Sequence, residues 1–289
     1  MTPTPDARRR FKHRAFVASK HARWAARDAR IALEDRRWAA LEEKFPYRYD
    51  PSFFAHTFLA REAPATPTLG AAPHRLWTIW LGGAPTPARK ASLQALEAQP
   101  GVEVTIVRTP RSVMLPGHPF HPAFEHLTSV HKSDYLRAYL MHHYGGAYID
   151  VKPMPHPVRP LIDQLNGSEE HLALGYAEVT SEYAGHPHHG LRAVLRRHYR
   201  ALMGPSMFIF KPHSPFTAEW MRELHARMDY LSAPLAEADA ADADPYATPA
   251  VYPIWWTEIL GDILHPLSLK YRDRVILTDS AQPVLQNYR

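Results

Sequence analysis

The chain has 289 residues, a formal net charge of +5, and 28 Pro against 13 Gly, and it contains no cysteine. Disulfides, thiolate metal sites and cysteine nucleophiles are therefore excluded, and the length suffices for one large domain or two small ones. The basic balance favours anionic partners such as nucleotide phosphates, anionic lipids or nucleic acid. Because no apolar run is long enough to span a bilayer and the first residues lack a signal-peptide core, we expect a cytoplasmic protein.

Residues 1–62 are predicted to form a basic helical extension. Between residues 8 and 30 there are nine Lys and Arg side chains and a single acid, Asp28. Small apolar residues recur there at helical spacing, which indicates one long helix, or two in series, ending before Pro46. One interpretation is a basic amphipathic helix lying on an anionic membrane face. The other is a solvated helix that packs a few aromatics against the main domain, and the mostly alanine stripe favours this second interpretation.

Residues 63–75 are rich in Pro and Ala and are predicted to be a linker, with the main domain covering 76–289. That domain opens with an expected strand at 76–81, a helix at 87–99 and a strand at 102–108. This order predicts an α/β fold with a Rossmann-like, mostly parallel sheet flanked by helices. Ligands bind beyond the carboxyl ends of the strands in such sheets, and Trp80, Gly82 and Gly83 stand at such an end.

The rest of the chain is organised around residues 131–153, HKSDYLRAYLMHHYGGAYIDVKP. We expect Ser133 to cap a helix that begins at Asp134, and Arg137 shares a face with Asp134 because three positions separate them. The pair Gly145-Gly146 permits a sharp turn with positive φ. A short strand at 147–149 then places Asp150 at its carboxyl end, so the two carboxylates are expected to meet at one sheet edge.

The C-terminal half continues the pattern of strands and helices. Strands are expected at 171–177, 206–210 and 275–278, and helices at 191–203, 216–231 and 255–265. Residues 234–250 are acidic and expected to be exposed. His186, His188 and His189 lie in a Pro- and Gly-containing segment, which we interpret as a loop rather than a metal site. At least one of Trp255 and Trp256 is expected in the core.

Two motifs resemble a known family. The pattern K-S-D-x-x-R followed by Y-G-G-x-Y-x-D is similar to glycosyltransferases with a DXD-containing sugar-binding region. These include capsular polysaccharide synthesis and polymannose-initiating transferases. Asp134 and Asp150 are 16 positions apart, as in that family, and IWLGG around Trp80 resembles its first strand. The resemblance covers residues 76–153, with a looser likeness from 206 onward. It implies a GT-A fold and a nucleotide-sugar donor.

The resemblance also implies roles for individual residues. Trp80 would stack on the base, with Gly82 beside it, while Asp134 and Arg137 would hold the donor sugar and its phosphate side. Asp150 would contact ribose, sugar or a metal ion. The donor-binding set is completed by residues of the second motif: Gly145, Gly146, Tyr148 and Lys152. On the acceptor side, Trp255, Trp256 and Glu258 are candidates.

One departure from the family concerns the metal. The DXD motif reads here Asp150-Val151-Lys152, and a protonated Lys cannot bind Mn²⁺ or Mg²⁺. In one hypothesis, Lys152 itself is the cation that faces the diphosphate. In a second, Lys152 points away and other acids, such as Glu258, complete a weaker metal site with Asp150. A third is a degenerate, inactive domain.

The sequence therefore predicts a hexosyltransferase, retaining by family likeness, that moves a sugar from a nucleotide-sugar to a glycan or lipid-linked acceptor. The resemblance places it in bacterial surface polysaccharide synthesis at the inner face of the membrane, with residues 8–30 as a peripheral contact. The competing class is a non-catalytic basic module for nucleic acid or an anionic glycan, although no recognised nucleic-acid motif is present. Asp134 and Asp150 also fit the paired acids of a hydrolase.

Overall fold

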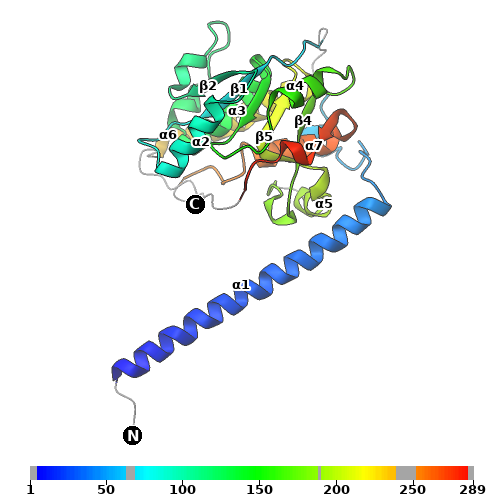
Figure 1. The fold of residues 1–289 in the computed structure, drawn as a ribbon. Helices are drawn as coiled ribbons and strands as arrows, with labels where there is room; N and C mark the ends of the chain where they lie inside the picture. Colours follow the sequence, from blue (N-terminus) through cyan, green and yellow to red (C-terminus); the bar gives the residue numbers. More distant parts are fainter. Residues whose placement is uncertain (1–4, 63–68, 188–189, 239–251, 286–289) are drawn as a thin grey trace.

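The computed structural model describes residues 5–62, 69–187, 190–238 and 252–285, and within these ranges the chain forms an α/β fold around one six-stranded sheet (Figure 1). The strands are β1 (Arg75–Ile79), β2 (Glu103–Val107), β3 (Gly146–Ile149), β4 (Ala173–Ala177), β5 (Met203–Phe210) and β6 (Val275–Leu277). The α-helices are α1 (Pro5–Lys44), α2 (Pro87–Glu97), α3 (Ser129–His143), α4 (Arg159–Asn166), α5 (Leu191–Arg197), α6 (Pro215–Glu237) and α7 (Gly261–Lys270). Short 3₁₀ turns fill several connections, including η4 (Ser181–Tyr183) and η5 (Tyr199–Ala201).

The sheet is mostly parallel, with the strand order β2-β1-β3-β5-β4-β6. β1 pairs in parallel with β2 and β3, and β4 pairs in parallel with β6. β5 runs against both of its neighbours, β3 and β4. The other five strands therefore all end at the same edge, which we call the carboxyl edge. The expectation of an α/β, mostly parallel sheet flanked by helices is confirmed.

Side-chain alternation along β5 explains why helices cover both faces of the sheet. Phe208 and Phe210 belong to one core cluster, together with α3 and α6 residues such as Tyr135 and Trp220. Met207 and Ile209 point the other way, into a second cluster with α4. Because successive strand residues face opposite sides, an unbroken apolar run requires apolar cover on both faces. These clusters fix the strands whose ends carry the candidate site.

The turn between α3 and β3 depends on two glycines. Gly145 and Gly146 have φ values of +66° and +87°, as the sequence predicts. A Cβ atom on Gly145 would lie 2.6 Å from Pro212 Cδ, and one on Gly146 would lie 2.7 Å from the Arg75 carbonyl oxygen. Neither conformation nor space therefore admits a side chain. The turn lets α3 pack on the sheet while β3 enters between β1 and β5.

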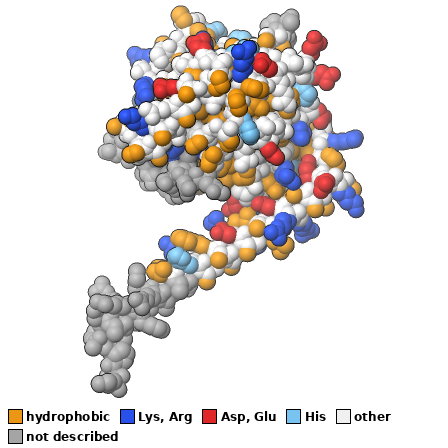
Figure 2. All heavy atoms as spheres, in the orientation of Figure 1, with side chains coloured by type: hydrophobic (Ala, Val, Ile, Leu, Met, Phe, Trp, Pro, Cys, Tyr) orange, Lys and Arg blue, Asp and Glu red, His pale blue; other side chains and the backbone are white. Residues whose placement is uncertain are grey.

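Helix α1 is one continuous helix of 40 residues that projects from the body (Figure 1). At 1.5 Å per residue it is about 60 Å long. Its C-terminal part contacts the body: Glu34 lies 3.0 Å from Arg196, and Asp35 accepts hydrogen bonds from Thr180 and Ser181. Earlier on the helix, Phe16 and Trp24 are exposed, and basic and apolar side chains alternate along this projecting part (Figure 2).

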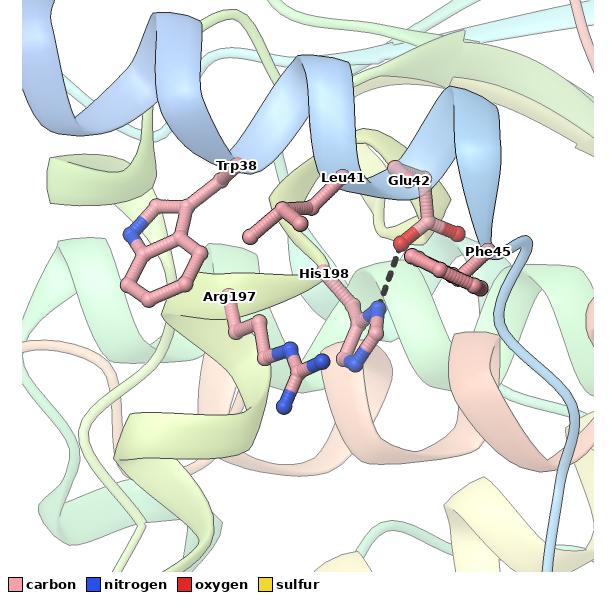
Figure 3. A pocket seen from close by; sticks show the side chains of 6 residues that line it. All are labelled: Trp38, Leu41, Glu42, Phe45, Arg197 and His198. Carbon is pink, nitrogen blue, oxygen red and sulfur yellow. Dashed lines mark hydrogen bonds and ion pairs between the residues drawn. The ribbon is translucent and has the colours of Figure 1, made fainter.

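A shallow pocket lies where α1 meets the end of α5 (Figure 3). Trp38, Leu41 and Phe45 supply its apolar wall from α1 and the residue that follows it. Glu42 reaches across to the Nδ1 atom of His198, and Arg197 completes the lining. The packing of Trp38 against the core agrees with a helix that packs aromatics on the main domain.

Several element boundaries differ from the sequence predictions. Thr128, not Ser133, caps α3, because its hydroxyl accepts from the His131 N–H and the helix starts one turn earlier than expected. The helix expected at 191–203 ends at Arg197, since the following residues form a 3₁₀ turn and β5 begins at Met203. The last helix starts at Gly261 rather than 255. Residues 63–68 of the expected linker and 239–250 of the acidic segment lie outside the described residues.

Candidate functional site

The carboxyl edge brings together polar groups that follow three strands. Trp80 follows β1, Asp150 follows β3 and Glu178 follows β4. β5 enters the sheet at this edge, and its Ser206 carbonyl accepts a hydrogen bond of 2.9 Å from the Asp150 N–H. This is the edge at which ligands bind in open α/β sheets.

Asp150 is held by cations on both of its carboxylate oxygens. Oδ1 lies 3.0 Å from a guanidinium nitrogen of Arg137, and Oδ2 lies 3.2 Å from the Lys152 ammonium. The Tyr148 hydroxyl donates a third contact to Oδ1 at 2.8 Å. Lys152 also donates to the Ser206 hydroxyl at 2.6 Å. Lys152 therefore points toward Asp150, contrary to the hypothesis in which it points away.

Arg137 joins the two carboxylates. Its guanidinium lies 3.6 Å from Asp134 as well as 3.0 Å from Asp150, and it donates to the Pro205 carbonyl at 3.4 Å. The guanidinium carbon stands 4.9 Å from the centre of the Tyr148 ring, a cation–π distance. The predicted meeting of Asp134 and Asp150 at one sheet edge is thus confirmed, with Arg137 between them. We call Asp134, Arg137, Asp150 and Lys152 the charged cluster.

Burial sets the electrostatics of the charged cluster. Asp134, Asp150 and Lys152 are 4%, 8% and 7% exposed, so solvent screens them little. Burial raises the pKa of Asp134 to about 7, because the opposing effect of Arg137 is smaller and Asp150 adds to the rise. Burial also acts to raise the pKa of Asp150, but Arg137, Lys152 and the Tyr148 hydroxyl outweigh it and hold this pKa below its usual range. The pKa values of these two neighbouring carboxyl groups are therefore shifted in opposite directions.

The loop after β1 lies beside the charged cluster. The half-buried indole of Trp80 donates to the Gly83 carbonyl at 2.8 Å, so the loop folds back around the ring. A Cβ on Gly82 would approach the indole to 3.6 Å. Arg89 of α2 donates to the Val151 carbonyl at 2.8 Å and ties the following helix to the end of β3.

The two turn glycines do not lie with the other predicted donor-binding residues. Gly145 and Gly146 stand at the amino end of β3, beside Pro212 and Arg75, whereas Asp150 follows its carboxyl end. Four strand residues separate the two ends, which at about 3.3 Å per residue is more than 10 Å. Their part is to shape the α3–β3 turn, and the prediction that they line the donor pocket is wrong on this geometry.

The predicted acceptor-side residues lie near the start of α3. Tyr252 contacts this junction: its hydroxyl oxygen accepts a hydrogen bond of 3.1 Å from the Thr128 N–H, and its ring stacks on that of His131 with the ring centres 5.3 Å apart. Trp255 and Trp256 follow and are 50% and 42% exposed, so the expectation that one is in the core is wrong. The Glu258 carboxylate accepts from the Trp255 N–H at 2.9 Å.

Sequence reasoning missed two buried polar residues near the carboxyl edge. Glu178 is 4% exposed and lies 3.4 Å from His265 of α7. His265 in turn accepts from the Gly185 N–H at 2.9 Å. The sequence does contain a signal for Glu178, because this residue directly follows the predicted strand 171–177, just as Asp150 directly follows the predicted strand 147–149. His188 and His189 lie outside the described residues, and the His186 N–H bonds to Asp262.

Comparisons with known proteins add no relative. The chain matches no protein-family model, no curated protein and no solved structure. Among the described residues, none of the helices combines the length and the apolar character needed to cross a membrane.

Proposed function

We propose that this chain is a glycosyltransferase of the GT-A type that transfers a sugar from a nucleotide-sugar donor to a glycan or lipid-linked acceptor. The observation that carries the proposal is the buried pair of cations, Arg137 and Lys152, clamped on Asp150 at the carboxyl edge. Burying two cations beside two carboxylates costs desolvation energy, and such a cluster is therefore a poor device for stability alone. Perturbed, buried charges at a ligand-binding edge are typical of functional sites.

The chemistry of the donor matches the charge of the cluster. Fully ionised, the four side chains of the charged cluster sum to zero. Because the pKa of Asp134 is raised to about 7, its protonation leaves the cluster with a net positive charge near neutral pH. A nucleoside diphosphate leaving group gains negative charge as the sugar departs, and fixed cations in a poorly solvated site stabilise that charge. Asp134 can then accept or donate a hydrogen bond to a sugar hydroxyl.

In this proposal, Lys152 supplies the charge that a divalent ion supplies in the family. Both oxygens of Asp150 already contact cationic groups, at 3.0 and 3.2 Å, and an ammonium stands where the second carboxylate ligand would be. This donor set does not fit Mn²⁺ or Mg²⁺, which require oxygen ligands around the ion. No step of the proposed reaction is therefore assigned to a metal ion at Asp150.

Aromatic side chains lie where this proposal places the donor base and the acceptor sugar. Trp80, beside the charged cluster on the next parallel strand, offers an indole for stacking a nucleotide base. Trp255 and Trp256 are exposed, and aromatic faces of this kind stack on sugars of an acceptor. The resemblance to the glycosyltransferase family implies a setting in bacterial surface polysaccharide synthesis at the inner membrane face, with retention at the anomeric carbon.

A donor-hydrolysis screen tests the proposal. The protein is incubated with a panel of UDP-, GDP-, CMP- and dTDP-sugars in EDTA, and released nucleotide is measured. We expect slow hydrolysis of at least one donor, and a matching thermal shift, both lost in Asp150→Ala and in Lys152→Met. Circular dichroism of each variant establishes that it is folded. Absence of hydrolysis and of any thermal shift across the panel would count against a transferase.

A non-catalytic basic module is the second candidate, and the projecting basic helix α1 is the observation that favours it. A binding module predicts salt-sensitive association with nucleic acid or an anionic glycan, without any nucleotide-sugar effect. Fluorescence anisotropy with labelled DNA, RNA and heparin at 50 and 200 mM salt separates the two candidates.

A further inference from the structure

A group of histidines lies at the opposite edge of the sheet from the charged cluster. His142 and His143 occupy the last turn of α3, immediately before the Gly145-Gly146 turn. His213 stands three residues after β5 ends, and β5 pairs antiparallel with β3, so its end meets the start of β3. Two segments about seventy positions apart in the chain thereby bring three imidazoles together.

The geometry of the three imidazoles suits one ion. One ligand nitrogen from each of His142, His143 and His213 lies within 4.8 Å of the others. A tetrahedral zinc ion holds its nitrogens 2.0–2.1 Å away and so about 3.4 Å from one another, which modest side-chain rotations reach. His118 approaches from the loop before α3, with its ring centre 4.6 Å from that of His143. It is exposed and stands outside the group of three that shares the 4.8 Å spacing, so a rotation of its side chain would bring it to the ion.

The backbone conformation of His213 supports a role for this residue beyond packing. His213 has φ of +53° and is the one non-glycine among the described residues with positive φ. This conformation is unfavourable for a residue with a side chain and persists where the surroundings enforce it. Here the His213 N–H donates to the His142 carbonyl at 2.8 Å, which carries the His213 side chain back toward the end of α3. The two rings stand 5.0 Å apart.

The ring nitrogens are arranged as metal ligands require. His142 Nδ1 lies 3.1 Å from the Thr217 hydroxyl, which leaves Nε2 for an ion and fixes the ring as outer partners of metal-bound histidines do. His143 Nδ1 is buried without a hydrogen-bond partner among the described residues. The end of a helix also favours a cation.

We propose that His142, His143 and His213 bind one transition-metal ion, Zn²⁺ foremost, with His118 as the fourth ligand. An all-imidazole set selects Zn²⁺, Cu²⁺ or Ni²⁺ over Mg²⁺, Ca²⁺ or Mn²⁺. The ion ties the end of α3 to the β5–α6 connection and thus fixes the helix that carries Asp134 and Arg137. The ion stands at the amino end of β3, away from Asp150, so its part is structural.

The test uses full-length, tag-free protein freed of metal with EDTA and then dialysed. Zn²⁺ is titrated by isothermal calorimetry and Co²⁺ by visible absorption. We expect one equivalent of tight binding and a tetrahedral Co²⁺ spectrum. His143→Ala and His213→Asn, in which Asn keeps the left-handed conformation accessible, should each weaken Zn²⁺ binding at least tenfold. Zn²⁺ should raise the melting temperature of the wild type but not that of either variant.

Two control variants test whether Zn²⁺ binding depends on this group of histidines and not on other histidines of the chain. His126→Ala removes an exposed histidine outside the group and should leave binding unchanged. A variant with His186, His188 and His189 all replaced by Ala should also retain the one equivalent. Far-UV circular dichroism of each metal-free variant establishes its fold. Unchanged Zn²⁺ affinity in a folded His143→Ala His213→Asn double variant, or loss of binding with the His186 group instead, overturns the proposal.

Discussion

At the scale of single residues, Lys152 supplies one of the two cationic groups that contact Asp150 in the charged cluster. Its ammonium contacts both the Asp150 carboxylate and the Ser206 hydroxyl. Without it, Asp150 retains Arg137 and the Tyr148 hydroxyl as partners. The carboxylate thus stays compensated, while one of two cations facing the ligand is lost. Stability and activity are therefore expected to respond differently to a change at this position.

Lys152→Met tests this separation. The variant keeps the aliphatic stem but removes the charge. We expect donor hydrolysis to fall by at least about 100-fold, the usual cost of removing one fixed charge-stabilising group. The free energy of unfolding should fall by only about 1–3 kcal/mol, the cost of one lost charged hydrogen bond. Urea unfolding and released-nucleotide assays measure the two. Added Mn²⁺ should not restore activity, and rescue by Mn²⁺ would point to a metal site instead.

Asp134 is the second residue with a distinct expectation, because its pKa is raised to about 7. Unfolded Asp has a pKa of about 3.9. Between these values the folded chain keeps a proton that the unfolded chain has released, so the free energy of unfolding falls as pH rises from about 4 to 7 and then levels. The lowered pKa of Asp150 acts in the opposite sense, since its contribution is lost as pH falls below about 4.

The substitution Asp134→Asn removes the pH-dependent contribution of Asp134 to the free energy of unfolding and leaves that of Asp150. The stability of the variant relative to the wild type should therefore rise between pH 4 and 7, by on the order of a few kcal/mol. Urea unfolding at half-unit pH steps measures the difference. The pH dependence of donor hydrolysis should also lose a limb near pH 7 in this variant. Parallel stability curves for the two proteins would show that Asp134 ionises normally.

At the scale of elements, the α3–β3 turn separates folding from function. Gly145→Ala would place a Cβ 2.6 Å from Pro212 and 2.9 Å from the Phe210 carbonyl, at a φ of +66°. We expect a loss of about 1–3 kcal/mol in the free energy of unfolding. The affinity of the variant for a nucleotide-sugar should stay within about twofold of the wild-type affinity, because the turn lies at the opposite end of β3 from Asp150. Gly167→Ala, where φ is −68° and the nearest neighbour is 3.5 Å away, is the matched control and should be near neutral.

A Gly145→Ala protein that is fully stable but no longer binds donor would reinstate the sequence-based prediction for this glycine. Thermal shift with the donor identified in the hydrolysis screen measures the binding side. Chemical unfolding measures the stability side. The two readouts together distinguish a turn residue from a binding residue.

These elements also show how far sequence reasoning reaches. The β1–α2–β2 order and the strand before Asp150 were predictable, because buried strands and glycine turns leave local patterns. Thr128 was missed because the preceding segment looks irregular in sequence; in the structure its hydroxyl caps α3 and its N–H bonds to the distant Tyr252. The boundary at Arg197 was missed because strand β5 competes for residues with good helix propensity.

The charged cluster and the histidine group illustrate the same limit. Asp134 and Arg137 share a helix face by spacing alone, so their contact was predictable. The contact of Lys152 with Ser206 joins positions 54 apart in the chain and depends on antiparallel pairing of β3 with β5. His213 meets His142 for the same reason, and no short-range pattern marks it. Contacts between side chains that lie far apart in the sequence, on strands paired only in the folded sheet, could not be predicted without the fold.

At the scale of the whole molecule, α1 divides into a docked part and a projecting part. Docking uses Glu34, Asp35 and Glu42, which contact Arg196, Thr180 and His198. Ile31 is the one described apolar residue of α1 that is fully buried. The projecting part keeps Phe16 and Trp24 at 60% and 51% exposure, among basic side chains. Such a helix is suited to a partner outside the body.

An anionic membrane surface is the partner that the first interpretation of the basic helix predicts for the projecting part. Each Lys or Arg near such a surface contributes about 1 kcal/mol, and the effect decays within a Debye length. We expect the full chain to bind vesicles containing phosphatidylglycerol, but not neutral vesicles, and to be released by 0.5 M salt. Lys20, Arg23 and Arg30, exposed basic residues, replaced together by Gln should weaken binding by at least tenfold. The matched control replaces Arg36, Arg37 and Lys44, exposed basic residues of the docked part, and should have a smaller effect. Equal losses in a co-sedimentation assay would show that only net charge matters, and no binding to anionic vesicles would assign α1 to packing alone.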